Sequence, residues 1–240
     1  MTSSAFFSGD IPFASFSQTH IYTLLFSLGL LIVIIATGRN LSREQNLLIG
    51  RCLSAFLSLT VIAFIALHIH FERFDISVDL PLSICNLFAF MAPLIFWNPN
   101  PKRMEVVYFA VMSGTFQAII TPDLYVGFPT YGFFKYWISH VGLVIIVIHY
   151  LLSFQLRPRA KGIFITFLWL NLYLMAIVPI NLLLDANYFY LMEKPINPSI
   201  LDLFGPWPTY LIVSEVLAMA FFAIAYLPIM WVNRFSKLSK

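Results

Sequence analysis

The chain has 240 residues, of which 60% are hydrophobic and only 10% are charged. Its mean hydropathy of +0.85 lies far outside the range of a soluble domain, so the composition predicts an integral membrane protein. Two cysteines in so long a chain exclude a disulfide scaffold. The basic residues behind the net charge of +3 lie singly or in threes between apolar runs, which excludes a nucleic-acid-binding patch.

Seven apolar segments are long enough to cross a bilayer core about 30 Å thick, since an α-helix rises about 1.5 Å per residue. In chain order they are Ile21–Thr37, Asn46–Ile69, Leu80–Trp97, Met104–Thr121, Phe133–Phe154, Gly162–Leu184 and Pro208–Val232. Lipid offers no partner for backbone polar groups, whereas a helix satisfies its own. The sequence therefore predicts an all-α, polytopic transmembrane bundle of about seven helices.

The basic residues indicate the orientation of this bundle. Most of the 14 follow the first, third, fifth and seventh predicted spans, and only Arg73, Lys135 and Lys194 lie on the other side. By the positive-inside rule, the N-terminus is outside and the C-terminus is cytoplasmic. We expect a multi-pass protein of the cell membrane. Its predicted divisions are an extracytoplasmic segment at 1–20, a single transmembrane domain at 21–232 and a basic cytoplasmic tail at 233–240.

Polar side chains gather near the outer ends of at least five predicted spans. The third span opens with Ser83, Cys85 and Asn86, while His140 and Glu215 each lie about two turns inside their own spans. An ionisable group within a span is costly unless it faces a polar interior or a partner. The sequence therefore predicts one outward-facing polar intramembrane cavity. Its other expected lining residues are Gln117, Asp123, Asn181, Trp207 and Tyr210.

Five segments also carry a family resemblance. They are LPLSIC at Leu80–Cys85, SGTFQAIITPDL at Ser113–Leu124, FFKYWISHVG at Phe133–Gly142, NYFYLMEKP at Asn187–Pro195 and GPWPTYL at Gly205–Leu211. Together they resemble the YwaF-like family of integral membrane proteins. Bacterial members of that family often place a histidine where this chain has Ser83, so a function carried by that histidine would be missing here.

A more distant resemblance implies a reaction class. The YwaF-like family is similar to eukaryotic membrane acyltransferases that remodel phospholipids and are proposed to use a cysteine nucleophile with a histidine. Cys85 and His140 are the positions that would correspond. The first hypothesis is therefore thiol-dependent acyl transfer or hydrolysis on membrane lipids. Cys85 would attack an ester, His140 would take the thiol proton, and Glu215 or Asn86 would orient the imidazole. Asn86, Gln117 or backbone N–H groups would hold the oxyanion.

The alternative hypothesis is a non-enzymatic transporter or small-molecule receptor that uses the same cavity, with Glu215 and His140 binding a cation or relaying a proton. A scaffold for a protein partner is the third interpretation. A retinal protein is disfavoured because the seventh span contains no lysine for a Schiff base. We expect no cofactor. A zinc site made by His68, His140 and Glu215 has no support from local spacing, and no metal ligands are assigned.

Overall fold

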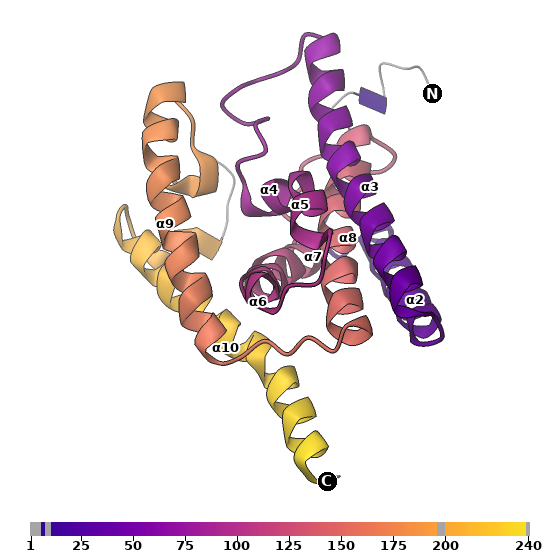
Figure 1. Ribbon diagram of the computed structural model, residues 1–240. Coiled ribbons are helices and arrows are strands. Elements are labelled where there is room, and N and C mark those ends of the chain that lie inside the picture. Colours follow the sequence, from indigo (N-terminus) through magenta and orange to yellow (C-terminus); the bar gives the residue numbers. More distant parts are fainter. Residues whose placement is uncertain (1–5, 8–10, 196–199, 239–240) are drawn as a thin grey trace.

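The computed structural model describes residues 6–7, 11–195 and 200–238, and these fold into helices joined by loops (Figure 1). Five helices are long and apolar enough to cross a membrane, counted over these described residues. They are α2 (Gln18–Arg39), α3 (Arg43–His70), α8 (Tyr131–Ser153), α9 (Lys161–Leu184) and α10 (Thr209–Leu238). This confirms the predicted all-helical membrane fold. The count of seven spans and the orientation of the termini stay predictions.

Helix α8 forms the centre of the fold. It packs against both α2 and α3 and against shorter helices, so that Leu143, Ile146 and Tyr150 are completely buried. Helix α2 differs, because most of its apolar side chains, such as Leu25 and Phe26, remain exposed, and only a few, such as Leu31, pack against the core. In a bilayer such side chains face lipid, so the exposure of α2 is what a peripheral membrane helix requires.

Small residues let α3 approach α8 closely. A Cβ atom added to Gly50 of α3 would lie only 2.4 Å from the Tyr150 ring, and one added to Gly142 of α8 would lie 2.4 Å from the Leu57 side chain. Glycine at both contacts removes the atoms that would hold the two backbones apart. The result is a tightly packed helix pair on which the remaining elements are arranged.

The predicted third span, Leu80–Trp97, is not one helix. It consists of α4 (Ile84–Phe90) and α5 (Ala92–Phe96), separated at Met91. Pro93 lies in the first turn of α5, where its missing N–H costs nothing, but it could not continue the hydrogen-bonding ladder of α4. Neither piece is long enough to cross the hydrocarbon core alone, so this segment is not one continuous helix, and a span made by the two pieces together stays a prediction.

The predicted fourth span is continuous but irregular. It begins as α6 (Pro101–Ala110), passes through the π-helix η1 (Val111–Thr115) and ends as α7 (Phe116–Ile120). The Asn100 side chain caps its start by accepting a hydrogen bond from the Arg103 N–H. A π-helical turn inside an α-helix often marks a functional site. Figure 1 shows these short helices gathered between α3 and α9.

The predicted divisions at the two chain ends stay predictions. Helix α2 starts at Gln18, inside the predicted segment 1–20, and α10 continues to Leu238, so most of the predicted tail is helical. Residues 1–5, 8–10 and 239–240 of those divisions lie outside the described residues. The short 3₁₀ helices η2 (Tyr188–Tyr190) and η3 (Ile200–Phe204) lie between α9 and α10.

Candidate functional site

The Cys85 thiol lies where α4 meets the π-helix η1. Its Sγ is 3.2 Å from Oγ1 of Thr115, within hydrogen-bond range for sulfur. Thr115 is completely buried, and Cys85 is half-buried against the main apolar core. The other cysteine, Cys52, is exposed on α3. The fold therefore gives the two cysteines different surroundings, and among the described residues only Cys85 has a polar partner inside the protein.

A lysine of α8 lies within electrostatic range of this thiol. Lys135 is half-buried and close enough to Cys85 and Asp79 to interact with both electrostatically. Its Nζ atom is 4.6 Å from the centre of the Phe64 ring, a cation–π distance. A cation at this position would stabilise a negative charge that forms on the sulfur or on an attached substrate oxygen.

The His140 imidazole has a defined tautomer. Its Nδ1 is 2.7 Å from the backbone carbonyl oxygen of Tyr136, and a carbonyl oxygen only accepts, so Nδ1 carries the hydrogen and donates it. The ring also stacks on Tyr136, with 3.9 Å between ring centres. No described residue hydrogen-bonds to Nε2. This nitrogen keeps its lone pair and can accept a proton, as a general base must.

Cys85 and His140 share their neighbours. Lys135 interacts electrostatically with both residues, and Tyr136 stacks on His140 while interacting electrostatically with Cys85. Both residues therefore lie within electrostatic range of Lys135, and no hydrogen bond among the described residues joins Cys85 to His140.

Charged residues at the entrance to α4 extend this region. The Asp79 carboxylate accepts a hydrogen bond from Nδ1 of His68 at 2.9 Å and another from the Asp75 N–H at 2.9 Å. His68 lies in the last turn of α3, so the contact ties α3 to the loop before α4. Lys135 is the other charged neighbour of Asp79. We expect this group to fix the loop that leads to Cys85.

Glu215 lies elsewhere. It lines a cavity of about 320 Å³ between η1, α9 and α10, and its Oε2 accepts a hydrogen bond of 2.9 Å from Nδ2 of Asn171. Ser113 and Gln117 line the same cavity, and His140 does not. The predicted contact of Glu215 with His140 is therefore not found. The Ser113 hydroxyl is buried there without a partner among the described residues.

Two more predicted cavity residues stabilise the loop after α9. The Asn181 side chain donates to the Tyr188 carbonyl at 3.0 Å and accepts from the Tyr188 N–H at 2.9 Å. The Asp123 carboxylate accepts from the Tyr190 hydroxyl at 2.8 Å. Both contacts satisfy polar groups of η2, so their geometry indicates a structural role.

The indole of Trp207 and the hydroxyl of Tyr210 also hydrogen-bond to the loop after α9. Trp207 donates to the Leu191 carbonyl at 3.1 Å, and Tyr210 donates to the Tyr190 carbonyl. On α4, Ser83 is the N-cap residue but makes no side-chain capping bond, and Asn86 is half-buried. The predicted polar residues thus divide among a thiol region, a carboxylate cavity and a loop, so the expectation of one shared cavity needs correction.

Three polar residues of these regions were missed from the sequence. The sequence did single out Lys135, because it is one of only three basic residues on the predicted outer side and lies at the start of a predicted span. Thr115 and Asn171 lie inside spans, where hydroxyls and amides commonly bond to their own backbone, as Asn171 also does to the Phe167 carbonyl at 3.0 Å. Only the packing of helices gives these two side chains their other partners.

The described residues contain no group of three or more His, Cys, Asp and Glu side chains that could hold a metal ion. The zinc hypothesis fails on this geometry, because Glu215 and His140 lie in different surroundings.

A model of the TMEM164 family matches residues 14–226, which extend from before α2 well into α10. The chain belongs to the TMEM164 family. TMEM164 is a membrane-protein family, and with five candidate spans among the described residues the match confirms a multi-pass membrane protein. No curated protein and no solved structure matches the chain. The YwaF-like and acyltransferase resemblance stays a prediction.

Proposed function

We propose that this TMEM164-family protein transfers or hydrolyses acyl groups of membrane lipids, with Cys85 as the nucleophile and His140 as the general base. The observation that carries the proposal is the shared surroundings of the two residues: a half-buried thiol and an imidazole with a free Nε2 have Lys135 and Tyr136 as common neighbours. A nucleophile and a base of defined tautomer in one region are the recurring components of acyl-transfer sites, and the proposal requires Nε2 of His140 to approach the thiol when substrate binds.

The reaction divides into two balanced halves. The Cys85 thiol gives its proton to Nε2 of His140, the sulfur attacks the ester carbonyl carbon, and the carbon–oxygen bond breaks. His140 returns the proton to the departing alcohol, leaving an acyl thioester on Cys85. A second alcohol, such as a lysolipid, or a water molecule then attacks the thioester, and the released thiolate regains its proton through His140.

Lys135 and Thr115 would stabilise the charges that develop. The lysine cation acts on the thiolate or on the oxyanion of the tetrahedral intermediate, and the Thr115 hydroxyl donates to the sulfur when it is deprotonated. Asn86 and Gln117 were the candidates from sequence for the oxyanion site. Gln117 instead hydrogen-bonds to Thr121 at 2.7 Å, so Lys135 and Thr115 replace it in the proposal.

The covalent intermediate provides the test. Purified protein in phosphatidylcholine vesicles is incubated with a phospholipid carrying a radiolabelled acyl chain, quenched in acid and assayed for label on the protein. We expect label that neutral hydroxylamine releases, as a thioester requires, and we expect Cys85→Ala to lose it. His140→Ala should slow its formation.

The second cysteine is the matched control. Cys52→Ala should retain the label, because that thiol is exposed on α3 and has no polar partner among the described residues. Label that persists in a folded Cys85→Ala variant, or that survives hydroxylamine, would exclude the thiol mechanism.

A second candidate function is supported by the Glu215 cavity. A carboxylate bonded to Asn171, beside a buried Ser113 hydroxyl that has no partner among the described residues, could bind a polar small molecule in a transporter or receptor without covalent chemistry. Loss of ligand binding in Glu215→Gln, together with full activity in Cys85→Ala, would favour this function over acyl transfer.

A further inference from the structure

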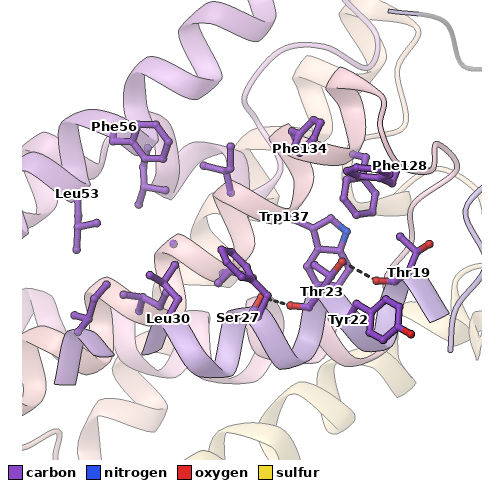
Figure 2. A pocket seen from close by; sticks show the side chains of 18 residues that line it. Thr19, Tyr22, Thr23, Ser27, Leu30, Leu53, Phe56, Phe128, Phe134 and Trp137 are labelled. Carbon is purple, nitrogen blue, oxygen red and sulfur yellow. Dashed lines mark hydrogen bonds between the residues drawn. The ribbon is translucent and has the colours of Figure 1, made fainter. Parts of the chain in front are cut away.

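A second cavity of about 600 Å³ lies on a different side of α8 from His140, between α2 and α3. Both helices pack along α8 but make little contact with each other, so a strip of α8 remains uncovered between them. Phe26 and Leu30 of α2, Phe56 of α3, and Trp137 and Val141 of α8 line this groove (Figure 2). Neither Cys85 nor His140 lines it.

One buried polar group faces this apolar groove without a partner. The Trp137 side chain is only 5% exposed, and no described residue accepts a hydrogen bond from its Nε1–H. The hydroxyls of Thr23 and Ser27 on the facing helix donate to backbone carbonyls of α2 at 2.8 and 2.6 Å, and neither accepts a hydrogen bond from the indole. A buried indole N–H normally has an acceptor, and leaving it unpaired costs about 1–3 kcal/mol.

The groove has a polar end and a long apolar end. Figure 2 shows the indole nitrogen of Trp137 on the side of Thr19 and Phe128, while Leu30 and Leu53 lie towards the other end. From Thr19 to Ile34 the lining face of α2 rises about 22 Å, which exceeds half the thickness of a hydrocarbon core of about 30 Å. An extended apolar chain that carries an oxygen acceptor near one end matches this shape.

The geometry points to a binding site for a glycerophospholipid, with one acyl chain along the α2–α3 groove and its ester carbonyl oxygen accepting from Nε1–H of Trp137. Trp137 lies in the second turn of α8, near the end of the span, where the ester groups of a lipid would be found. No described lining residue is charged, which disfavours the carboxylate of a free fatty acid. The site stands whether or not Cys85 performs acyl transfer.

The ring of Trp137 is held in place for this role. It contacts His20 and Phe133, with ring centres 5.4 and 6.0 Å away, and His20 itself hydrogen-bonds to the Ile119 carbonyl at 3.1 Å. An indole fixed on two sides presents its donor in one direction before any lipid arrives. Such preorganisation reduces the entropy lost on binding.

Photolabelling tests the site. The purified protein in vesicles receives a trace of phosphatidylcholine with a diazirine in its acyl chain, in an ester-linked or an ether-linked form, and labelled peptides are mapped by mass spectrometry. We expect labels on the groove-lining parts of α2 and α8. Because the ether form lacks the carbonyl acceptor, the ester form should label about fivefold more, and Trp137→Phe should abolish that preference.

Two matched variants separate the groove from the lipid that surrounds every membrane helix. Ser27→Phe fills the groove and should reduce labelling severalfold, while Leu28→Phe adds the same ring to an outward-facing position of α2 and should not. Equal ester and ether labelling of the wild-type protein would overturn the proposal, as would equal labelling of the two phenylalanine variants. So would competition by oleate but not by unlabelled phosphatidylcholine.

The outcome does not depend on the proposed chemistry. Cys85→Ala leaves the groove intact and should show the wild-type labelling pattern even if acyl transfer is lost. A protein that forms the thioester but shows no ester preference would refute the lipid groove alone, whereas the reverse result would refute only the thiol mechanism.

Discussion

Two polar regions lie on the two sides of the π-helix η1, and their ionisable groups differ in hydrogen-bond partners and in nearby charge. On one side, the Cys85 thiol and the His140 imidazole have a nearby cation and a nitrogen left free to accept a proton. On the other side, the Glu215 carboxylate already accepts a hydrogen bond from Asn171. Similar depth along the spans therefore does not give similar chemistry. The rotation of each helix decides which region a side chain joins.

The largest expected effect is on the thiol side. His140→Ala removes the proton acceptor Nε2 and should lower acyl transfer by roughly 10²–10⁴-fold, the usual contribution of a general base. Transfer of a labelled acyl chain to a lysolipid measures the effect. His70→Ala is the control, because His70 lies exposed at the end of α3. A loss below about tenfold would show that the imidazole is not the general base. The thiol region would then have no proton acceptor that distinguishes it from the Glu215 region.

Loss of the cation should come next. Lys135→Gln keeps a long polar side chain but removes the charge beside Cys85, and we expect a decrease of about 10²-fold in kcat with little change in KM. Lys135→Arg should retain part of the activity because it retains the charge. If both variants lose activity equally while remaining folded, the lysine acts through its shape and the electrostatic role is wrong.

A smaller effect is expected from the hydroxyl that links η1 to the thiol. Thr115→Val is close in shape and keeps the buried packing, but it removes the hydrogen bond to Sγ. A hydrogen bond to a charged sulfur is worth at least about 1.5 kcal/mol, so thioester formation should slow roughly tenfold. Single-turnover kinetics measure this step directly. An unchanged rate would mean that the contact serves packing alone.

The smallest effect on acyl transfer should come from the carboxylate side. Glu215→Gln retains an acceptor for Asn171 and should change acyl transfer less than about twofold. Glu215→Leu leaves the Asn171 amide with only its backbone partner and should lower the thermal unfolding temperature, measured in detergent. A large loss of turnover in the folded Glu215→Gln variant would show that the carboxylate takes part in acyl transfer and that the two regions act as one catalytic site.

The long spans could be predicted well because hydropathy alone defines them. The expected Gly162–Leu184 and Asn46–Ile69 became α9 and α3 with similar bounds, since lipid requires a run of apolar residues of helical length. The broken third span was harder. Apart from Ser83, Cys85 and Asn86 near its start, its composition is apolar, and the placement of Pro93 early in α5 explains why one predicted helix is two.

The catalytic roles of Cys85 and His140 stay predictions, and the hydrogen-bond partners of the candidate residues could not be predicted from the sequence. Cys85 and His140 stood out because thiols and imidazoles are rare in apolar spans. Their neighbours depend on how α4 and α8 rotate about their axes, which sequence spacing within one helix cannot give. Glu215 shows the limit most clearly, because its predicted depth suited His140 while its helix faces Asn171 instead. The π-turn at η1 left no recognisable pattern.

The π-helix η1 contributes residues to both polar regions, because Thr115 contacts the Cys85 thiol and Ser113 lines the Glu215 cavity. Its i→i+5 hydrogen bonds accommodate one residue more than the i→i+4 bonds of an α-helix, so a π-turn can absorb a single-residue insertion. Gly114 is the residue that η1 could lose most easily, because it has open space around it and a Cβ added there would meet no atom within 4 Å. Its deletion would return the segment to the α-helical ladder and leave α7 with nearly the same rotation relative to α6. A one-codon deletion would thus remove the wide turn beside Cys85 while keeping the two flanking helices in place.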